Sequence, residues 1–256
     1  MALPESSRER LGIWALGLVF VAFALLVGFA GTTFVPPVDA VEAAETESAV
    51  TVQPAAGGYA IYPADRDPEA GLVFYPGARV EPGAYVPLLA PVVERTGVAV
   101  FVPEPRLHLA VFEPGMATRF VAEHPGIEHW YVGGHSLGGA MACLYAADHD
   151  GTVDGLVLFG AYCDRSIEAT DLAVLSIGGT RDTVLGTDRS ALRPGHLPPS
   201  AQIHLVEGLN HTQFGSYAGQ KGDSPATISR ATAHDRLQSL LVEFLIAERT
   251  ARSGPT

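Results

Sequence analysis

The chain has 256 residues, of which 47% are hydrophobic, and it carries 28 acidic against 16 basic side chains, a formal net charge of −12. This negative charge argues against nucleic-acid partners, because nucleic acids bind basic surfaces and the sequence has no basic cluster. About 200 residues follow an apolar N-terminal stretch, enough for one domain with a sizeable core.

The N-terminal stretch has the features of a membrane anchor. Residues 11–30 carry no charged side chain, and a helix of that length spans roughly the 30 Å hydrocarbon core. Arg8 and Arg10 precede it, and the next basic residue is Arg66. The positive-inside rule therefore predicts a single-pass anchor in the cell membrane with the domain on the extracytoplasmic side. A cleaved signal peptide and a secreted protein are the alternative.

Beyond the anchor, strand-like apolar runs alternate with helical stretches. This alternation is typical of βαβ units and predicts an α/β fold with a doubly wound, mainly parallel sheet. The last helix is predicted over residues 226–248, where Leu237, Leu241 and Phe244 recur at helical spacing. The strand-like runs are 71–75, 98–102, 129–132, 155–160, 172–179 and 201–206.

The stretch Gly134-His135-Ser136-Leu137-Gly138 has the form G-x-S-x-G between a strand-like run and a helix-like run. A nucleophile elbow requires this context, since the tight turn lifts the serine hydroxyl clear of the sheet and needs flanking glycines. The helix N-terminus then points at negative charge that develops beside the serine. The sequence predicts Ser136 as a nucleophile. The alternative is a Gly-Ser turn that only begins a helix.

A serine nucleophile needs a base, and the base needs an orienting acid. In sheets with such an elbow the acid and then the histidine follow the serine along the chain, each after a strand end. Asp182 follows the run 172–179, and His211 follows the run 201–206. We therefore predict Asp182 as the orienting acid and His211 as the general base. Asp164, one strand earlier, is the competing acid.

Four stretches that follow one another along the chain resemble the α/β-hydrolase superfamily. They are most similar to its small alpha/beta hydrolase fold-5 group, which is related to dienelactone hydrolases. The resemblance runs from about Tyr59 to Leu245. It implies a Ser136–Asp182–His211 triad that hydrolyses an ester-like bond. The stretches are Phe74-Tyr75-Pro76-Gly77, 132–140, Gly179-Thr180-Arg181-Asp182 and 210–215.

Two backbone N–H groups are also needed to bind the oxyanion of a tetrahedral intermediate. One is expected from Leu137, directly after the nucleophile. Aligning Gly77 with the glycine of the family's His-Gly turn makes the amide of Ala78 the second candidate. Pro76 replaces the histidine that often braces this loop in relatives. An ordinary β-turn is the equally weighted alternative, because Pro-Gly is common in turns.

The predicted function is a membrane-anchored serine hydrolase that cleaves a carboxylic ester, or a related acyl bond, of a small-molecule or lipid-like substrate through an acyl-enzyme. No cofactor is required, and no metal-ligand spacing occurs in the sequence. A thioesterase, lipase or peptidase would use the same triad. The alternative from another class is a non-catalytic, membrane-tethered binding protein on the same fold.

The sequence also leads to expectations for the two cysteines, for two aromatic side chains and for the bounds of the segments. Cys143 and Cys163 could pair in an oxidising compartment, but the place of Cys143 in the helix after the elbow favours a buried thiol. Tyr85 and Phe214 line either the pocket or the core. The segments are a cytoplasmic N-terminus (1–10), a transmembrane signal-anchor (11–35), a flexible tether (36–57), the hydrolase domain (58–250) and a disordered tail (251–256).

Overall fold

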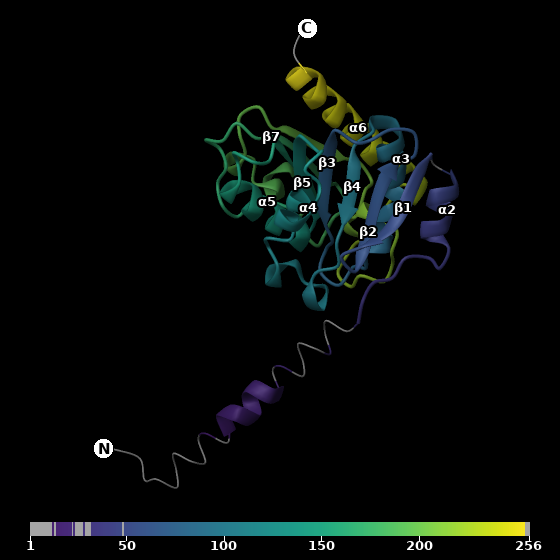
Figure 1. Ribbon diagram of the computed structural model, residues 1–256. Coiled ribbons are helices and arrows are strands. Elements are labelled where there is room, and N and C mark those ends of the chain that lie inside the picture. The colour runs from purple at the N-terminus through teal and green to yellow at the C-terminus, as the bar shows by residue number, and fades with distance from the viewer. Residues whose placement is uncertain are drawn as a thin grey trace.

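The computed structural model describes residues 32–47 and 49–253, together with residues 12, 14–21, 23 and 28. Its centre is an eight-stranded sheet in the order β1-β2-β4-β3-β5-β6-β7-β8 (Figure 1). The six strands from β4 to β8 in that order run parallel to one another. β2 pairs antiparallel with β4, and β1 pairs antiparallel with β2. This confirms the predicted α/β fold with a mainly parallel sheet. The strands are β1 (Val50–Ala55), β2 (Gly58–Pro63), β3 (Ala70–Tyr75), β4 (Ala99–Val102), β5 (His129–His135), β6 (Gly155–Phe159), β7 (Ala173–Gly179) and β8 (Gln202–Val206).

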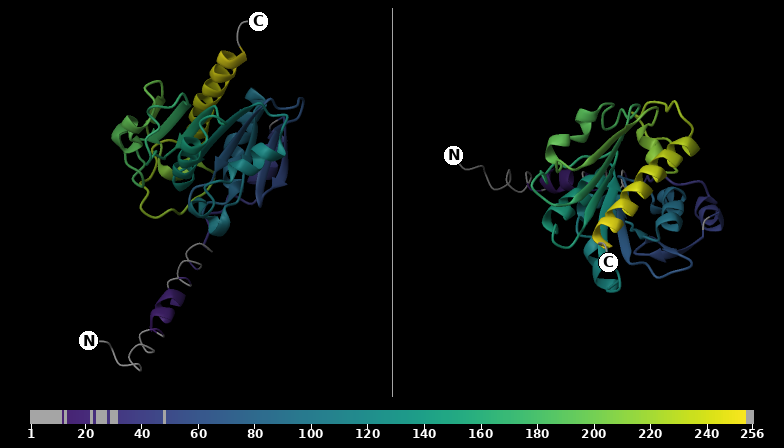
Figure 2. Two further views of the ribbon diagram at one scale, coloured as in Figure 1. Left: turned by 60° about the vertical axis from the view of Figure 1, so that its left-hand side comes forward. Right: turned by 90° about the horizontal axis from the view of Figure 1, so that it is seen from above.

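Helices cover both faces of the sheet, with α2, α3 and α6 on one side and α4 and α5 on the other (Figure 2). The helices are α2 (Ala40–Glu47), α3 (Val86–Thr96), α4 (Ala117–Glu123), α5 (Leu137–Asp148) and α6 (Arg230–Ser253). Short 3-10 turns are η1 (Pro82–Tyr85), η2 (Arg106–His108), η3 (Ala110–Phe112), η4 (Arg189–Leu192), η5 (Pro194–His196) and η6 (His211–Phe214).

Strand β3 shows why the central strands read as continuous apolar runs. Leu72 and Phe74 pack into the core under α3 and α6, whereas Val73 and Tyr75 pack into the core under α4 and α5. A parallel strand covered on both faces buries both sets of alternating side chains. The sheet therefore holds the loops at its carboxyl edge on a rigid support.

The segment predicted as a flexible tether, residues 36–57, is instead part of the folded domain. It contains α2 and β1, and β1 pairs with β2 in a hairpin through Ala56 and Gly57, both at positive φ. β1 is an edge strand, which is where a strand tolerates a residue such as Pro54. The domain therefore begins well before residue 58.

The C-terminal boundary also differs from the prediction. α6 begins at Arg230 and ends at Ser253, later at both ends than the predicted helix over 226–248. It therefore takes in the first three residues of the predicted tail over 251–256. Residues 254–256 lie outside the described residues.

The predicted cytoplasmic N-terminus, residues 1–10, and most of the predicted signal-anchor, residues 11–35, lie outside the described residues. Within the part that is described, no helix has the length and apolar character needed to cross a membrane. The anchor stays a prediction.

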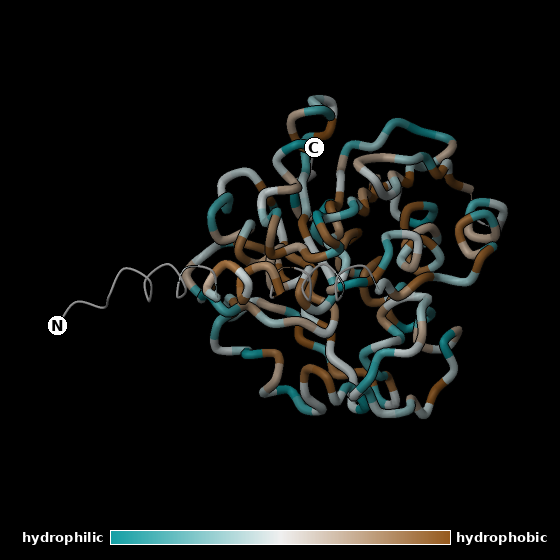
Figure 3. The backbone as a smooth tube through the Cα atoms, turned by 90° about the horizontal axis from the view of Figure 1, so that it is seen from below, coloured by the Kyte–Doolittle hydropathy of each residue, from teal (hydrophilic) through white to brown (hydrophobic). Residues whose placement is uncertain are grey.

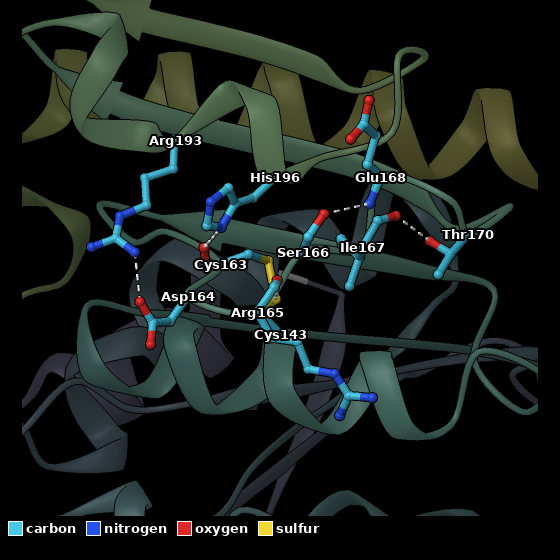
Figure 4. The surroundings of a disulfide bond; sticks show 10 residues. All are labelled: Cys143, Cys163, Asp164, Arg165, Ser166, Ile167, Glu168, Thr170, Arg193 and His196. Atoms are coloured by element: carbon cyan, nitrogen blue, oxygen red, sulfur yellow. Dashed lines mark hydrogen bonds and ion pairs between the residues drawn. A yellow bond between two sulfur atoms is a disulfide. The ribbon is translucent and has the colours of Figure 1, made fainter.

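The expectation of a buried thiol at Cys143 is wrong. Cys143 and Cys163 form a disulfide with a Cα–Cα distance of 5.5 Å, the usual separation for such a bond (Figure 4). The loop after β6 passes over α5 at this point, and only the tertiary fold shows that approach. The bond ties the helix that follows the elbow to the loop after the neighbouring strand.

Removing this disulfide should lower stability measurably. A closed loop with a sequence separation of 20 corresponds to about 3 kcal/mol of lost unfolded-state entropy. We expect the Cys143→Ala/Cys163→Ala double variant to lose about that much free energy of unfolding, measured by urea denaturation. Reductant should destabilise the wild type similarly and leave the variant unchanged. Equal stability of the variant and the oxidised wild type would contradict the expectation.

Candidate active site

Ser136 lies at the turn between β5 and α5, as the sequence predicts. Its backbone has a positive φ, with φ 54° and ψ −124°, a strained conformation for a non-glycine residue. The Ser136 N–H donates to the carbonyl of Phe159 at 3.0 Å, which fixes the turn against β6. A Cβ at Gly138 would lie 2.2 Å from the carbonyl oxygen of Tyr75, so only glycine fits there. The start of α5 thus packs directly on the end of β3.

Asp182 and His211 meet in the interior at the carboxyl edge of the sheet. His211 Nδ1 lies 2.8 Å from Asp182 Oδ2, and both side chains are almost fully buried. The other oxygen, Oδ1, accepts from the amides of Val184 and Leu185 at 3.0 and 2.8 Å. With these contacts the carboxylate is fixed, and its Oδ2 faces Nδ1 of the imidazole.

The second ring nitrogen of His211 is the one available for proton transfer. Nε2 is buried and has no hydrogen-bond partner among the described residues, so no bond to the half-buried Ser136 is formed. Catalytic hydrogen bonds are often long before substrate binds. The pair therefore presents Nε2, without a hydrogen-bond partner among the described residues, on the side of the imidazole away from Asp182.

His135 packs beside this pair. Its ring centroid lies 4.5 Å from that of His211, and its Nδ1 lies 3.0 Å from the Tyr85 hydroxyl. Burial, and then the proximity of His211, hold the pKa of His135 well below its ordinary value. His135 is therefore a neutral ring that packs directly against the imidazole of His211.

The turn after β3 has the unpaired amide that an oxyanion donor requires. The Gly77 N–H donates to the Tyr85 hydroxyl at 2.9 Å, and the Arg79 N–H donates to the carbonyl of His108 at 2.8 Å. Between them, the Ala78 N–H has no hydrogen-bond partner among the described residues, and neither has that of Leu137. A hydrogen bond from Val80 to Gly77 also closes an ordinary β-turn here. Both candidate donors are thus unpaired.

The structure separates the two candidate acids. Asp164 is exposed on the loop after β6, where its carboxylate pairs with Arg193 at 2.5 Å (Figure 4). Asp182 is the acid that contacts His211. Within the described residues, no group of three or more His, Cys, Asp or Glu side chains is arranged to hold a metal ion.

Comparison with known proteins assigns the chain to a family. Residues 71–235, more than half of the chain, match the model of the alpha/beta hydrolase family. The chain belongs to the alpha/beta hydrolase family. The match includes the elbow, Asp182 and His211, so these residues lie within the part of the hydrolase domain that the family shares.

Solved structures share the alpha/beta hydrolase fold. Est1E from Butyrivibrio proteoclasticus has a TM-score of 0.56 at 11% identity, covering 79% of this chain and 100% of that one. A CIB-like hydrolase from Thermoplasma acidophilum has a TM-score of 0.56 at 15% identity, covering 77% and 98%. The esterase domain of a Rhodothermus marinus protein has a TM-score of 0.52 at 14% identity, covering 78% and 97%. At such identities the likeness shows the fold alone. No curated protein sequence matches the chain.

The alpha/beta hydrolase site also contains residues that sequence reasoning missed. Asn210 and Gln213 form a capping box around η6, the turn that carries His211. The Asp223 carboxylate accepts from the amides of His211 and Thr212 at 3.1 and 2.8 Å. The N-x-x-Q spacing could have indicated the capping box, whereas nothing local indicates Asp223. Together they fix the backbone of the predicted base.

Proposed function

We propose that this hydrolase cleaves carboxylic esters, or related acyl bonds, with Ser136 as nucleophile. The observation that carries the proposal is the buried Asp182–His211 pair at the same sheet edge as the elbow, with His211 Nε2 unpartnered within the part of the chain that the structure describes. The Rhodothermus marinus domain is described as an esterase domain, which agrees with this chemistry.

The mechanism follows from these groups. His211 Nε2 takes the proton of Ser136 as its Oγ attacks the ester carbonyl carbon, and Asp182 stabilises the imidazolium that forms. The amides of Leu137 and Ala78 donate to the oxyanion. The intermediate then breaks the bond to the leaving alcohol, which takes the proton from His211. Water, deprotonated by His211, attacks the acyl-enzyme and releases the acid and free Ser136.

We also propose that the segment 11–35 anchors the protein in the cell membrane, with the domain on the extracytoplasmic side. The described side chains of Trp14, Leu16 and Phe20 are 75, 76 and 71% exposed, so these three apolar side chains do not pack into the core of the domain. The disulfide suits an oxidising compartment on the extracytoplasmic side. A cleaved signal and a secreted enzyme remain the alternative.

Labelling by a fluorophosphonate probe tests the catalytic proposal, because the probe reacts with an activated serine. We expect the wild-type protein to be labelled, and peptide mass spectrometry to locate the adduct on Ser136. A folded wild type that takes no label, and hydrolyses no ester in a panel of acyl lengths, would favour the non-catalytic binding protein.

Tyr85 is expected to act as a positioning residue. Its hydroxyl accepts from Gly77 N–H and contacts His135, and burial raises its pKa well above the ordinary value, so it stays protonated. Tyr85→Phe should lower kcat about 10-fold, with KM little changed, because the turn loses one hydrogen bond that fixes the Ala78 amide.

Tyr217→Phe is the matched control for that change. Tyr217 is equally buried, but its hydroxyl donates to Gln220 and not to the turn. Steady-state kinetics on p-nitrophenyl acetate should show a kcat close to wild type. Equal losses in both variants would indicate a general packing effect and contradict the positioning role of Tyr85.

A further inference from the structure

Three features of the fold meet at Arg79, the residue after the proposed oxyanion donor. Its backbone N–H donates to His108 in η2, and its carbonyl accepts from Phe34 at 2.6 Å. Its side-chain Nε donates to the carbonyl of Thr32 at 2.7 Å. The catalytic turn, the loop after β4 and the point where the N-terminal segment enters the domain therefore form one structural unit.

The connection between the apolar segment and this unit is short. Phe34 forms a β-bridge with Val80, and the Thr33 hydroxyl donates to Glu81 at 2.8 Å. Only Gly31 separates the charge-free stretch 11–30 from Thr32, a distance of at most about 7 Å. The domain is thus attached to the apolar segment at its catalytic edge, without the long tether that the sequence predicted.

A cavity links the entry point to the catalytic turn. It has a volume of about 370 Å³ and is lined by Ala78, Arg79 and Phe34 together with residues 219–221. The same cavity therefore borders a proposed oxyanion donor and the first residues after the apolar segment.

The loop after β4 presents apolar side chains at this edge. Leu107, Val111 and Phe112, which we term the apolar loop, are 40, 49 and 45% exposed. Figures 1 and 2 place η2 and η3 at the end of the domain from which the described N-terminal residues (purple) extend, and Figure 3 views the domain from that end with hydrophobic stretches in brown. An ion pair of 3.0 Å between Arg106 and Glu113 fixes the loop with these side chains outward.

We propose that the catalytic edge of the domain lies on the outer surface of the membrane, with the apolar loop in the lipid interface, and that the enzyme takes ester substrates borne by the bilayer. The substrate class rests on the proposed ester hydrolysis, and the orientation rests on the proposed membrane segment 11–35. Basic and acidic groups alternate along the loop at Glu104, Arg106 and Glu113, so zwitterionic phospholipid suffices as the partner.

Depth-dependent quenching tests the orientation. The full chain with Val111→Cys, labelled with bimane, is reconstituted in phosphatidylcholine vesicles containing nitroxide-labelled lipid; the native cysteines are held in their disulfide. The matched control is Ile246→Cys on α6, 47% exposed against 49% for Val111. We expect strong quenching at position 111 and little at 246. Equal quenching at the two positions, or recovery of the protein away from the vesicles, would overturn the orientation.

Activity measurements test the substrate class. Phe112→Asp should lower hydrolysis of a fluorogenic ester embedded in the vesicles at least about 10-fold, because a charge in the loop opposes insertion, and leave hydrolysis of soluble p-nitrophenyl acetate unchanged. Val111→Asp provides a second, independent variant. Unchanged rates on both substrates would refute the substrate class. A wild type inactive on both would refute the proposed function, and the quenching result would still decide the orientation.

Discussion

Replacing Ser136 with alanine is expected to abolish fluorophosphonate labelling and to reduce ester hydrolysis by roughly 10⁵- to 10⁶-fold. The methyl group cannot attack a carbonyl or form the acyl-enzyme, and the remaining groups only bind and polarise the substrate. His211→Ala should be similarly inactive, because His211 is the imidazole that contacts Asp182. Initial rates on p-nitrophenyl acetate, together with gel fluorescence of the labelled protein, measure both effects.

Ser239→Ala is the matched control, since this serine is half-buried on α6, far along the chain from the elbow, and its hydroxyl donates to the helix backbone at Asp235. It should retain wild-type labelling and rate. Circular dichroism should show that Ser136→Ala is folded. A normal rate in that variant would refute Ser136 as the nucleophile.

Asp182→Asn is expected to lower kcat by about 10³- to 10⁴-fold while the fold persists. Oδ1 already accepts two backbone amides, from Val184 and Leu185, so asparagine would keep its oxygen there and turn its NH₂ toward His211. An NH₂ facing Nδ1 forces the imidazole proton onto Nε2. The base then has no lone pair for the serine proton.

Asp164→Asn separates this electronic effect from the loss of any acidic residue near the sheet edge. The Asp164 side chain is 82% exposed and pairs with Arg193. The kcat of the Asp164→Asn variant should therefore stay within about twofold of wild type. Steady-state kinetics of both variants, with thermal unfolding to verify the fold, decide the assignment. A larger loss in Asp164→Asn than in Asp182→Asn would show that the acid is misassigned.

The sequence indicates where a residue lies in the fold when that residue directly follows a predicted strand. Each of Ser136, Asp182 and His211 follows the end of a parallel strand, and such strands bring their carboxyl ends to one edge. Short-range patterns could therefore locate the candidate residues. They could not supply the contacts from which the site is built, such as Tyr85 to Gly77 or Asp223 to His211, because these partners come from separate loops.

The errors have the same physical origin. Residues 36–57 resemble a linker because small and acidic residues and prolines predominate, yet Val50 pairs with Pro63, and Ala44 is buried in the core beside α3. Both contacts form only when the hairpin and α3 are in place. The disulfide was misjudged similarly, since Cys163 lies in a loop whose path over α5 no periodicity encodes.

The fit of Gly138 against the carbonyl of Tyr75 has a consequence for how this site can vary. The backbone of Gly138 contacts the backbone of Tyr75 directly, without an intervening side chain. This contact fixes the positions of the Leu137 and Ala78 amides relative to each other. Substitutions in the surrounding loops can therefore change the cavity beside Ala78 without disturbing the spacing of the two candidate donors. An engineer who diversified residues 219–221, which line the cavity beside Ala78, and left the elbow intact would reshape that cavity while the two amides keep their positions.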